Sequence, residues 1–215
     1  DFPFEVRLIQ SLGGRGLLDR AVETLPDDAA LAERQAKNQP LTRAEIGVLL
    51  AYAKLAVCAD LLAGHVADDT TLDNELVRYF PKRMRKVHGE DIEAHRLRAE
   101  IIATAIGNSM INRGGPTYLV RVADRTGASP VAIARAYVAV RDSFALQDLN
   151  GAIDGLDNKV PGTVQLDLYR TVEDLVLDKT VWFLRNADFS GGVGPVVAAF
   201  GETVATLGGK LARLL

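Results

Sequence analysis

Two groups of residues in this sequence have the types and spacing that could bind a small charged molecule. The first is a dense basic cluster, formed by Arg78, Lys82, Arg83, Arg85 and Lys86. Such a cluster could attract a phosphate or another anionic ligand. Acidic side chains follow at once, at Glu90, Asp91 and Glu93, and are expected to compensate its charge. A charged surface facing solvent is therefore the favoured interpretation, and a dedicated anion site is the alternative.

The second group is polar and combines a predicted helix with a later loop. Asn108 and Asn112 are four residues apart, so they share one face of a largely apolar helix, and Arg113 follows them. Asn158 and Lys159 lie in the loop. Buried polar groups need hydrogen-bond partners, so a structural network that fixes the register of the helix is the simple interpretation. A small-molecule pocket formed by these five residues is the alternative.

Metal-binding and nucleophilic patterns are not evident. The three histidines, His65, His88 and His95, match no spacing such as His-Glu-x-x-His, and zinc needs three or four suitable ligands. No metal site is therefore predicted. The single cysteine, Cys58, lies in an apolar stretch, where a buried and inert thiol is expected.

Two glycine-rich stretches resemble phosphate loops only superficially. The first, at residues 191–194, precedes a helix but follows Phe189 and Ser190 rather than a strand, and it lacks a Gly-Lys-Ser/Thr ending. In the second, Lys210 follows two glycines inside a helical pattern, where a lysine is expected to face solvent. A linker and a helix are the favoured interpretations.

The elements that must position these residues are all predicted to be helices. The pattern predicts an all-α multi-helix bundle of roughly eight to ten helices, with no β-sheet. Start and stop signals are clear at Thr42 and Glu45 (a capping box), at Gly115 and Pro116, and at Ser129 followed by Pro130. The helices are expected at 2–12, 17–37 (broken at Pro26), 42–63, 71–80, 90–112, 117–126, 130–143, 145–155, 161–186 and from about 195 onward.

We expect one helical domain over residues 1–215. Residues 1–40 form a segment of short helices, residues 41–187 the helical core, and residues 188–215 a terminal helix. The terminal helix carries apolar residues at heptad spacing: Val197, Phe200, Val204, Leu207, Leu211 and Leu214. Packing on neighbouring helices is favoured over a seam between chains.

Composition narrows the class of protein. A chain of 215 residues with a formal charge of −3 lacks the basic excess typical of a nucleic-acid binder. One cysteine suits a reducing compartment. No signal peptide is evident, and Lys54 and Asp60 interrupt the most apolar stretch, Ile46 to Ala63, so a core helix is favoured over a membrane span. Because the chain stops in mid-pattern, it is expected to be a piece of a longer protein.

Several long runs resemble the C-terminal region of the large bacterial NAD-specific glutamate dehydrogenases. These runs are LTRAEIGVLLAYAKL (41–55), RYFPKRM (78–84), HRLRAEIIATAIGNSMINRGGPTYLVR (95–121), GASPVAIARAYVAVRDSF (127–144) and IDGLDNKVPGTVQLDLY (153–169). The resemblance covers about residues 1–187. It implies a parent enzyme that oxidises L-glutamate with NAD to 2-oxoglutarate and ammonia, forms NADH, and is a large cytoplasmic homo-oligomer.

The family's catalytic core carries a Gly-rich lysine motif and a dinucleotide-binding βαβ unit. Neither has a counterpart here, and Gly208-Gly209-Lys210 does not match the lysine motif. No catalytic or cofactor-binding residue is therefore assigned, and NAD is expected only in the parent enzyme. The chain alone is expected to be inactive.

The resemblance implies a non-catalytic domain with an architectural, oligomerisation or regulatory role. Its expected partners are the catalytic domain of the same polypeptide and further copies of the parent, without nucleic acid or membrane. The alternative is a module that binds an effector or a protein through the Arg78–Lys86 cluster.

Overall fold

The computed structural model describes residues 2–211, and within that range the chain consists of helices and loops without a β-strand. The predicted all-α class is confirmed. The α-helices are α1 (Phe2–Gly14), α2 (Asp28–Ala36), α3 (Arg43–Ala63), α4 (Asp73–Tyr79), α5 (Lys82–Val87), α6 (Gly89–Glu93), α7 (Arg98–Gly114), α8 (Tyr118–Thr126), α9 (Pro130–Ser143), α10 (Leu146–Asp154), α11 (Gly162–Asn186) and α12 (Val193–Leu211). Two short 3-10 helices, Val66–Asp68 and Thr70–Leu72, lie between α3 and α4.

Cap geometry confirms three of the predicted helix boundaries. The Thr42 hydroxyl accepts from the Glu45 amide, and the Glu45 carboxylate accepts from the Thr42 amide, which completes the capping box of α3. The Ser129 hydroxyl caps α9 by accepting from the amide of Ala132. Gly115 ends α7 with φ of 79°, a conformation that few other residues adopt without strain.

The predicted helix over 90–112 is wrong, because the structure divides it into α6 and α7. The backbone amide of Leu97 donates to Nδ1 of His95 at 3.1 Å in the intervening turn. Arg98 then begins α7, and its guanidinium donates to the carbonyl of Ala67 at 2.8 Å and pairs with Asp73. Contacts with a distant segment therefore override a local helical pattern. Together with the unpredicted α5, this break brings the described α-helices to twelve rather than the eight to ten expected.

The predicted helix at the start of 17–37 also does not form. Residues 17–27 make turns, in which the Asp19 carboxylate accepts from the amides of Ala21 and Val22. Asp27 then caps α2 by accepting from the amide of Ala30. A side chain that satisfies nearby amides offers the backbone an alternative to the helix.

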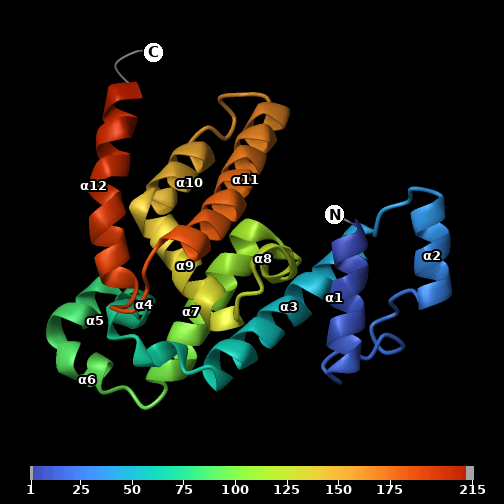
Figure 1. Ribbon diagram of the computed structural model, residues 1–215, viewed down its shortest axis with the longest axis horizontal. Helices are drawn as coiled ribbons and strands as arrows, with labels where there is room; N and C mark the ends of the chain where they lie inside the picture. The colour runs from blue at the N-terminus through green and yellow to red at the C-terminus, as the bar shows by residue number, and fades with distance from the viewer. Residues whose placement is uncertain (1, 212–215) are drawn as a thin grey trace.

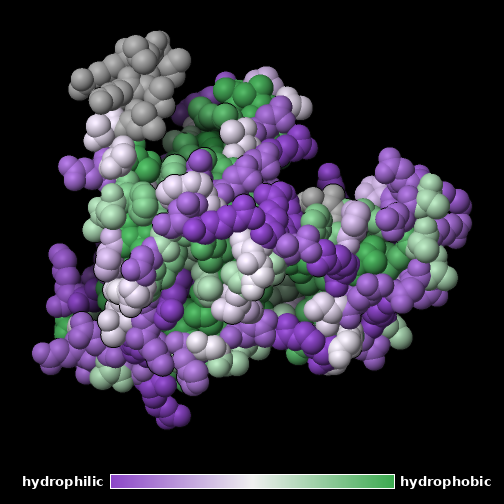
Figure 2. Space-filling model, viewed as in Figure 1, coloured by the Kyte–Doolittle hydropathy of each residue, from purple (hydrophilic) through white to green (hydrophobic). Residues whose placement is uncertain are grey.

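The core is centred on α7 and α9. α3 packs along α7, while α11 and α12 pack along α9, and α1 with α2 lies at the end of the molecule farthest from α12 (Figure 1). The largest fully buried side chains of the described chain come from many helices; they include Ile9 on α1, Leu49 on α3, Ile102 and Ile106 on α7, Tyr118 on α8, Tyr137 on α9 and Phe183 on α11. On the face that Figure 2 shows, polar side chains are widespread and apolar side chains are exposed at the end of the molecule where α11 begins. The exposed large apolar residues near the start of α11 are Val164, Leu166 and Leu168.

α3 is the one helix of the described chain that is long and apolar enough, by length and composition, to cross a membrane. A core helix satisfies the same criteria. α3 packs against α1, α7 and α9 and buries one stripe, formed by Leu49, Ala53, Ala56, Val57 and Leu61.

The first half of the terminal heptad seam packs inside the chain. Val197 and Phe200 lie against the core, and the Phe200 ring meets those of Trp182 and Phe183 on α11 at 5.6 and 5.1 Å between centroids. Val204 is half-buried. The side chains of Leu207, Leu211 and Leu214 lie outside the described part of the chain, so the second half of the seam stays a prediction.

Candidate functional site

A cavity of about 590 Å³ opens between α7, α9, α10 and α11. Its walls are mostly polar, and they are formed by Ser109, Asn112, Arg113, Tyr137, Arg141, Leu146, Gln147, Asn150, Gly151, Asp154 and Val176. A second cavity of about 280 Å³ lies beside it and shares Asn112, Arg113 and Asn150 with the first. Ligand sites have volumes of this order and use a few polar groups to orient what they bind.

Arg113 stands in the wall that the two cavities share, and α10 holds it there. Its Nη1 donates to Oδ1 of Asn150 at 3.1 Å. Asn150 is itself almost fully buried, and its Nδ2 donates to the carbonyl of Leu146 at 2.7 Å. Both the oxygen and the nitrogen of the Asn150 amide are thus hydrogen-bonded. Asn150 therefore positions the Arg113 guanidinium, and most of the N–H donors of the guanidinium stay unused.

The cavity wall also presents hydroxyl groups, from Ser109 on α7 and Tyr137 on α9. Tyr137 is 1% exposed, and its hydroxyl shares a hydrogen bond of 2.8 Å with the hydroxyl of Ser109. Burial raises the pKa of Tyr137, although the Ser109 bond and the charges of Arg141 and Arg113 oppose that effect. At neutral pH the phenol is therefore protonated and can either donate or accept.

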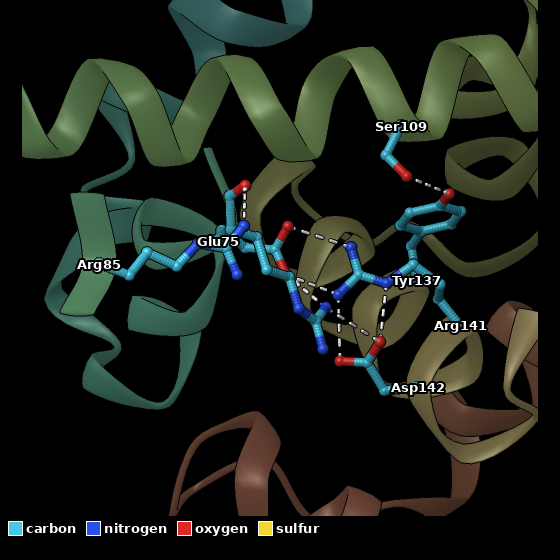
Figure 3. Close-up of polar contacts among 7 residues, drawn as sticks. Glu75, Arg85, Ser109, Tyr137, Arg141 and Asp142 are labelled. Carbon is cyan, nitrogen blue, oxygen red and sulfur yellow. Dashed lines mark hydrogen bonds and ion pairs between the residues drawn. The ribbon is translucent and has the colours of Figure 1, made fainter. Parts of the chain in front are cut away.

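Arg141 lies one helical turn after Tyr137, and the carboxylates of Glu75 and Asp142 balance its charge. Its Nη1 and Nη2 donate to the two carboxylate oxygens of Glu75 at 3.1 and 2.6 Å, and its Nε donates to Asp142 at 2.8 Å (Figure 3). Burial by itself disfavours the cation, but the hydrogen bonds to Asp142 and Glu75 raise the pKa of Arg141. Arg141 therefore stays charged without being free to bind a second anion.

The polar group predicted from the sequence is divided in the structure. Asn112 and Arg113 line the cavity, whereas Asn108 is half-buried on α7 outside it. Asn158 and Lys159 are exposed in the loop after α10, where the Asn158 amide donates to Asp157 at 3.1 Å. Within the described chain neither Asn108 nor Asn112 makes a side-chain hydrogen bond, so they do not form the expected network.

The sequence interpretation missed most of the lining residues. Tyr137 and Arg141, and likewise Asn150 and Asp154, are four residues apart and share a helix face. That spacing was visible in the sequence. Nothing local, however, indicated that the faces of α9 and α10 meet the face of α7 around one cavity.

The basic cluster also divides into two kinds of residue. Arg78 pairs with Glu75 at 3.5 Å and with Asp142 at 3.8 Å. Arg85 donates to the backbone carbonyls of Phe80 and Arg78 at 2.6 and 2.9 Å, so it closes the end of α4. The remaining residues, Lys82, Arg83 and Lys86, are exposed on α5 and make no ion pair with the described residues.

Among the described residues, no ion pair joins the basic cluster to Glu90, Asp91 or Glu93. Asp91 pairs with His88 at 3.0 Å instead, and the described salt bridges of the cluster go to Glu75 and Asp142. Arg78 is balanced by Glu75, three residues before it on α4, and by the distant Asp142, rather than by the carboxylates that follow the cluster.

The glycine-rich loop before α12 is occupied by the chain itself. The amide of Val193 donates to the hydroxyl of Thr71 at 2.9 Å. Gly192 has φ of 85°, and a Cβ placed on it would lie 2.6 Å from Oδ1 of Asp69. This close approach explains a glycine at that position without a phosphate and agrees with the linker interpretation.

The possible metal ligands and the single cysteine are the remaining reactive residue types. Among the described residues, no three His, Cys, Asp or Glu side chains are grouped to hold a metal ion. Cys58 is half-buried, its Sγ lies 3.7 Å from the carbonyl of Ala103, and burial raises the pKa of the thiol. A raised pKa reduces the reactive thiolate.

The chain is similar to known proteins over almost its whole length. The family model "Glutamate dehydrogenase, C-terminal" matches residues 38–215. The NAD-specific glutamate dehydrogenase of Pseudomonas aeruginosa is 41% identical over 209 residues, which is 97% of this chain and 13% of that protein. Those of Halomonas elongata and Mycobacterium tuberculosis are 40% and 31% identical, over 83% and 67% of this chain and 11% and 9% of the relatives.

The match therefore covers a small part of each relative, and the rest of each relative lies outside the region compared. The chain belongs to the family of the glutamate dehydrogenase C-terminal region, and its relatives are NAD-specific glutamate dehydrogenases.

Proposed function

We propose that this chain is the helical C-terminal region of an NAD-dependent glutamate dehydrogenase and that it does not carry the oxidation chemistry itself. Dinucleotide-binding enzymes of this kind place the cofactor at the carboxyl edge of a parallel sheet. The observation that supports a non-catalytic role is that residues 2–211 contain no strand from which such a sheet could be built. The parent reaction converts L-glutamate, NAD and water to 2-oxoglutarate, ammonia and NADH.

The role we propose is architectural, by contact with the catalytic part of the same polypeptide in a cytoplasmic homo-oligomer. Exposed apolar side chains at the start of α11 support such a contact. Val164 and Leu168 are four residues apart on one face of the helix and are 44% and 38% exposed, and clustered apolar surface commonly marks an interface. Replacing Leu168 with Glu in the parent is expected to weaken assembly, and an unchanged oligomer mass would exclude this surface.

The direct test compares NADH formation by the purified 215-residue chain with that of its full-length parent. L-glutamate and NAD are supplied to both, and absorbance at 340 nm is followed. Activity in the parent without activity in the chain supports the proposal. Turnover by the chain alone would show that helices can supply the chemistry, which would refute the inference from the missing strands.

A second role, binding of an anionic effector or an acidic protein surface, is supported by Lys82, Arg83 and Lys86. These residues are exposed on α5 and lack ion pairs within the described chain. Changing Lys82 and Lys86 to Glu in the parent should abolish an effector response of this type. Arg85 is unsuitable for that test, because its bonds to two backbone carbonyls make it part of the fold. A response retained in the double variant would refute the second role.

A further inference from the structure

The 590 Å³ cavity offers hydrogen-bonding groups that the chain itself leaves unused. Among the described residues, only Asn150 accepts from the Arg113 guanidinium. The amide side chains of Asn112 and Gln147, which also line the cavity, make no hydrogen bond with the described residues. Polar groups that converge on a concave site are the usual means of fixing the orientation of a ligand.

The charges of the lining indicate the chemistry of that ligand. Arg141 is neutralised by Glu75 and Asp142, so its charge is already balanced. Two charged groups remain, the guanidinium of Arg113 and the carboxylate of Asp154. Asp154 lies one helical turn after Asn150 and accepts from the hydroxyl of Tyr169, which leaves further acceptor positions on its carboxylate.

We propose that this cavity binds a small molecule that carries both a carboxylate, held by Arg113, and a hydrogen-bond donor, accepted by Asp154. A planar guanidinium matches a carboxylate through two parallel hydrogen bonds. Asn112 and Gln147 supply further donors or acceptors for the body of the ligand.

Two other ligand classes fit the lining less well. A phosphate dianion would bring a second negative charge near Asp154, while the cavity offers one unpaired cation. A wholly apolar ligand would displace water from the guanidinium and the amides without replacing its hydrogen bonds, which is unfavourable.

Binding can be measured by ¹H–¹⁵N NMR titration of the 215-residue chain with matched probes. These are 4-aminobutyrate (carboxylate and ammonium), butyrate (carboxylate alone), butyramide (neutral) and inorganic phosphate. Affinity is expected to fall in the order 4-aminobutyrate, butyrate, butyramide, with shifts in α7 and α10. Butyramide binding as tightly as 4-aminobutyrate, phosphate binding more tightly, or no binding by any probe would overturn the proposal.

Charge variants test the two contacts separately. Arg113→Gln is expected to weaken 4-aminobutyrate at least about tenfold, since it removes a charge-assisted bidentate bond. Asp154→Asn should remove the preference for 4-aminobutyrate over butyrate while keeping the acceptor for Tyr169. Arg170→Gln is the matched control, because Arg170 is an exposed arginine outside the cavity, paired with Asp167.

A third variant blocks the cavity without altering a polar group. Gly151 lines it, and a Cβ added there meets nothing within 4 Å. Gly151→Leu places a side chain at the opening and should favour α10, since glycine is a poor helix former. It is expected to abolish binding, whereas Gly47→Leu, at another open helical glycine, should bind as the unchanged chain does.

Binding within twofold of the unchanged chain in both Arg113→Gln and Gly151→Leu would refute the assignment. The readout is binding to the chain, so it does not depend on the proposed place of the chain in a dehydrogenase. An inactive parent and an empty cavity are therefore distinguishable results.

Discussion

Replacing Glu75 with Gln should destabilise the fold far more than neutralising an exposed carboxylate. Glu75 and Arg141 form a pair whose side chains are 7% and 3% exposed, and they join α4 to α9. Glutamine keeps the shape of the side chain but removes its charge. The guanidinium of Arg141 would then stay buried with Asp142 as its one remaining carboxylate partner among the described residues.

The expected loss is about 2–3 kcal/mol in the free energy of unfolding. Removing one partner of a buried pair costs roughly 3–5 kcal/mol, because the other charge is left uncompensated. Asp142 reduces that cost, since it accepts from Nε and Nη2 of Arg141 at 2.8 and 3.0 Å. The control is Asp167→Asn in the Arg170–Asp167 pair, where both side chains are about 70% exposed and about 0–1 kcal/mol is expected.

Urea denaturation followed by circular dichroism at 222 nm provides the measurement, with the slope against urea checked for each variant. The double variant Glu75→Met with Arg141→Met should be more stable than Glu75→Met alone, because it leaves no unpaired guanidinium in the core. A loss for Glu75→Gln no greater than that of Asp167→Asn would refute the inference that this pair joins α4 to α9 energetically.

Three further predictions follow from individual groups. Burial raises the pKa of Tyr118 and Tyr137 in the folded chain, so the stability that these residues contribute is present below pH ~10 and is lost as the pH rises further. Urea denaturation between pH 8 and 11 should show this fall in the free energy of unfolding, and a flat profile would contradict it. Gly192→Ala places a Cβ 2.6 Å from a carboxylate oxygen at a position with positive φ, so it should lower the free energy of unfolding by about 1–3 kcal/mol. Gly162→Ala, with open space at its Cβ, should change stability little in the same denaturation assay. Burial raises the pKa of the Cys58 thiol, so its reaction with a disulfide reagent at pH 8 should be at least about tenfold slower than in the urea-unfolded chain, and equal rates would show that the thiol is freely exposed.

Local signals in the sequence were sufficient for most of the fold. The capping box at Thr42, the serine cap at Ser129 and the glycine stop at Gly115 each depend on groups within a few residues, and the structure confirms all three. The two wrong helices show the limit of such signals. At 94–97 the break coincides with Arg98 reaching Ala67 and Asp73, which are at least 25 residues away.

The candidate site was predictable only in part. Asn112 was identified because its spacing from Asn108 on one helix is a local property, and Arg113 was included because it follows Asn112. Tyr137 and Asn150 were missed, because their place in the cavity depends on how α9 and α10 pack against α7. Asn158 and Lys159 have suitable side chains, but their loop lies outside the cavity lining.

The sequence by itself determined that this chain is helical, where most helices begin and end, and to which family it belongs. Periodicity and caps act over three or four residues, so the order of residues contains that information directly. Only the tertiary structure decided which arginine side chains keep hydrogen-bond donors for a ligand. Arg78 and Arg141 are paired by Glu75 and Asp142, Arg85 closes a helix, and Arg113 keeps most of its donors. The pairing of Arg141 with Glu75 and the contact of Arg113 with Asn150 join segments 66 and 37 residues apart, so they exist only once the helices have packed.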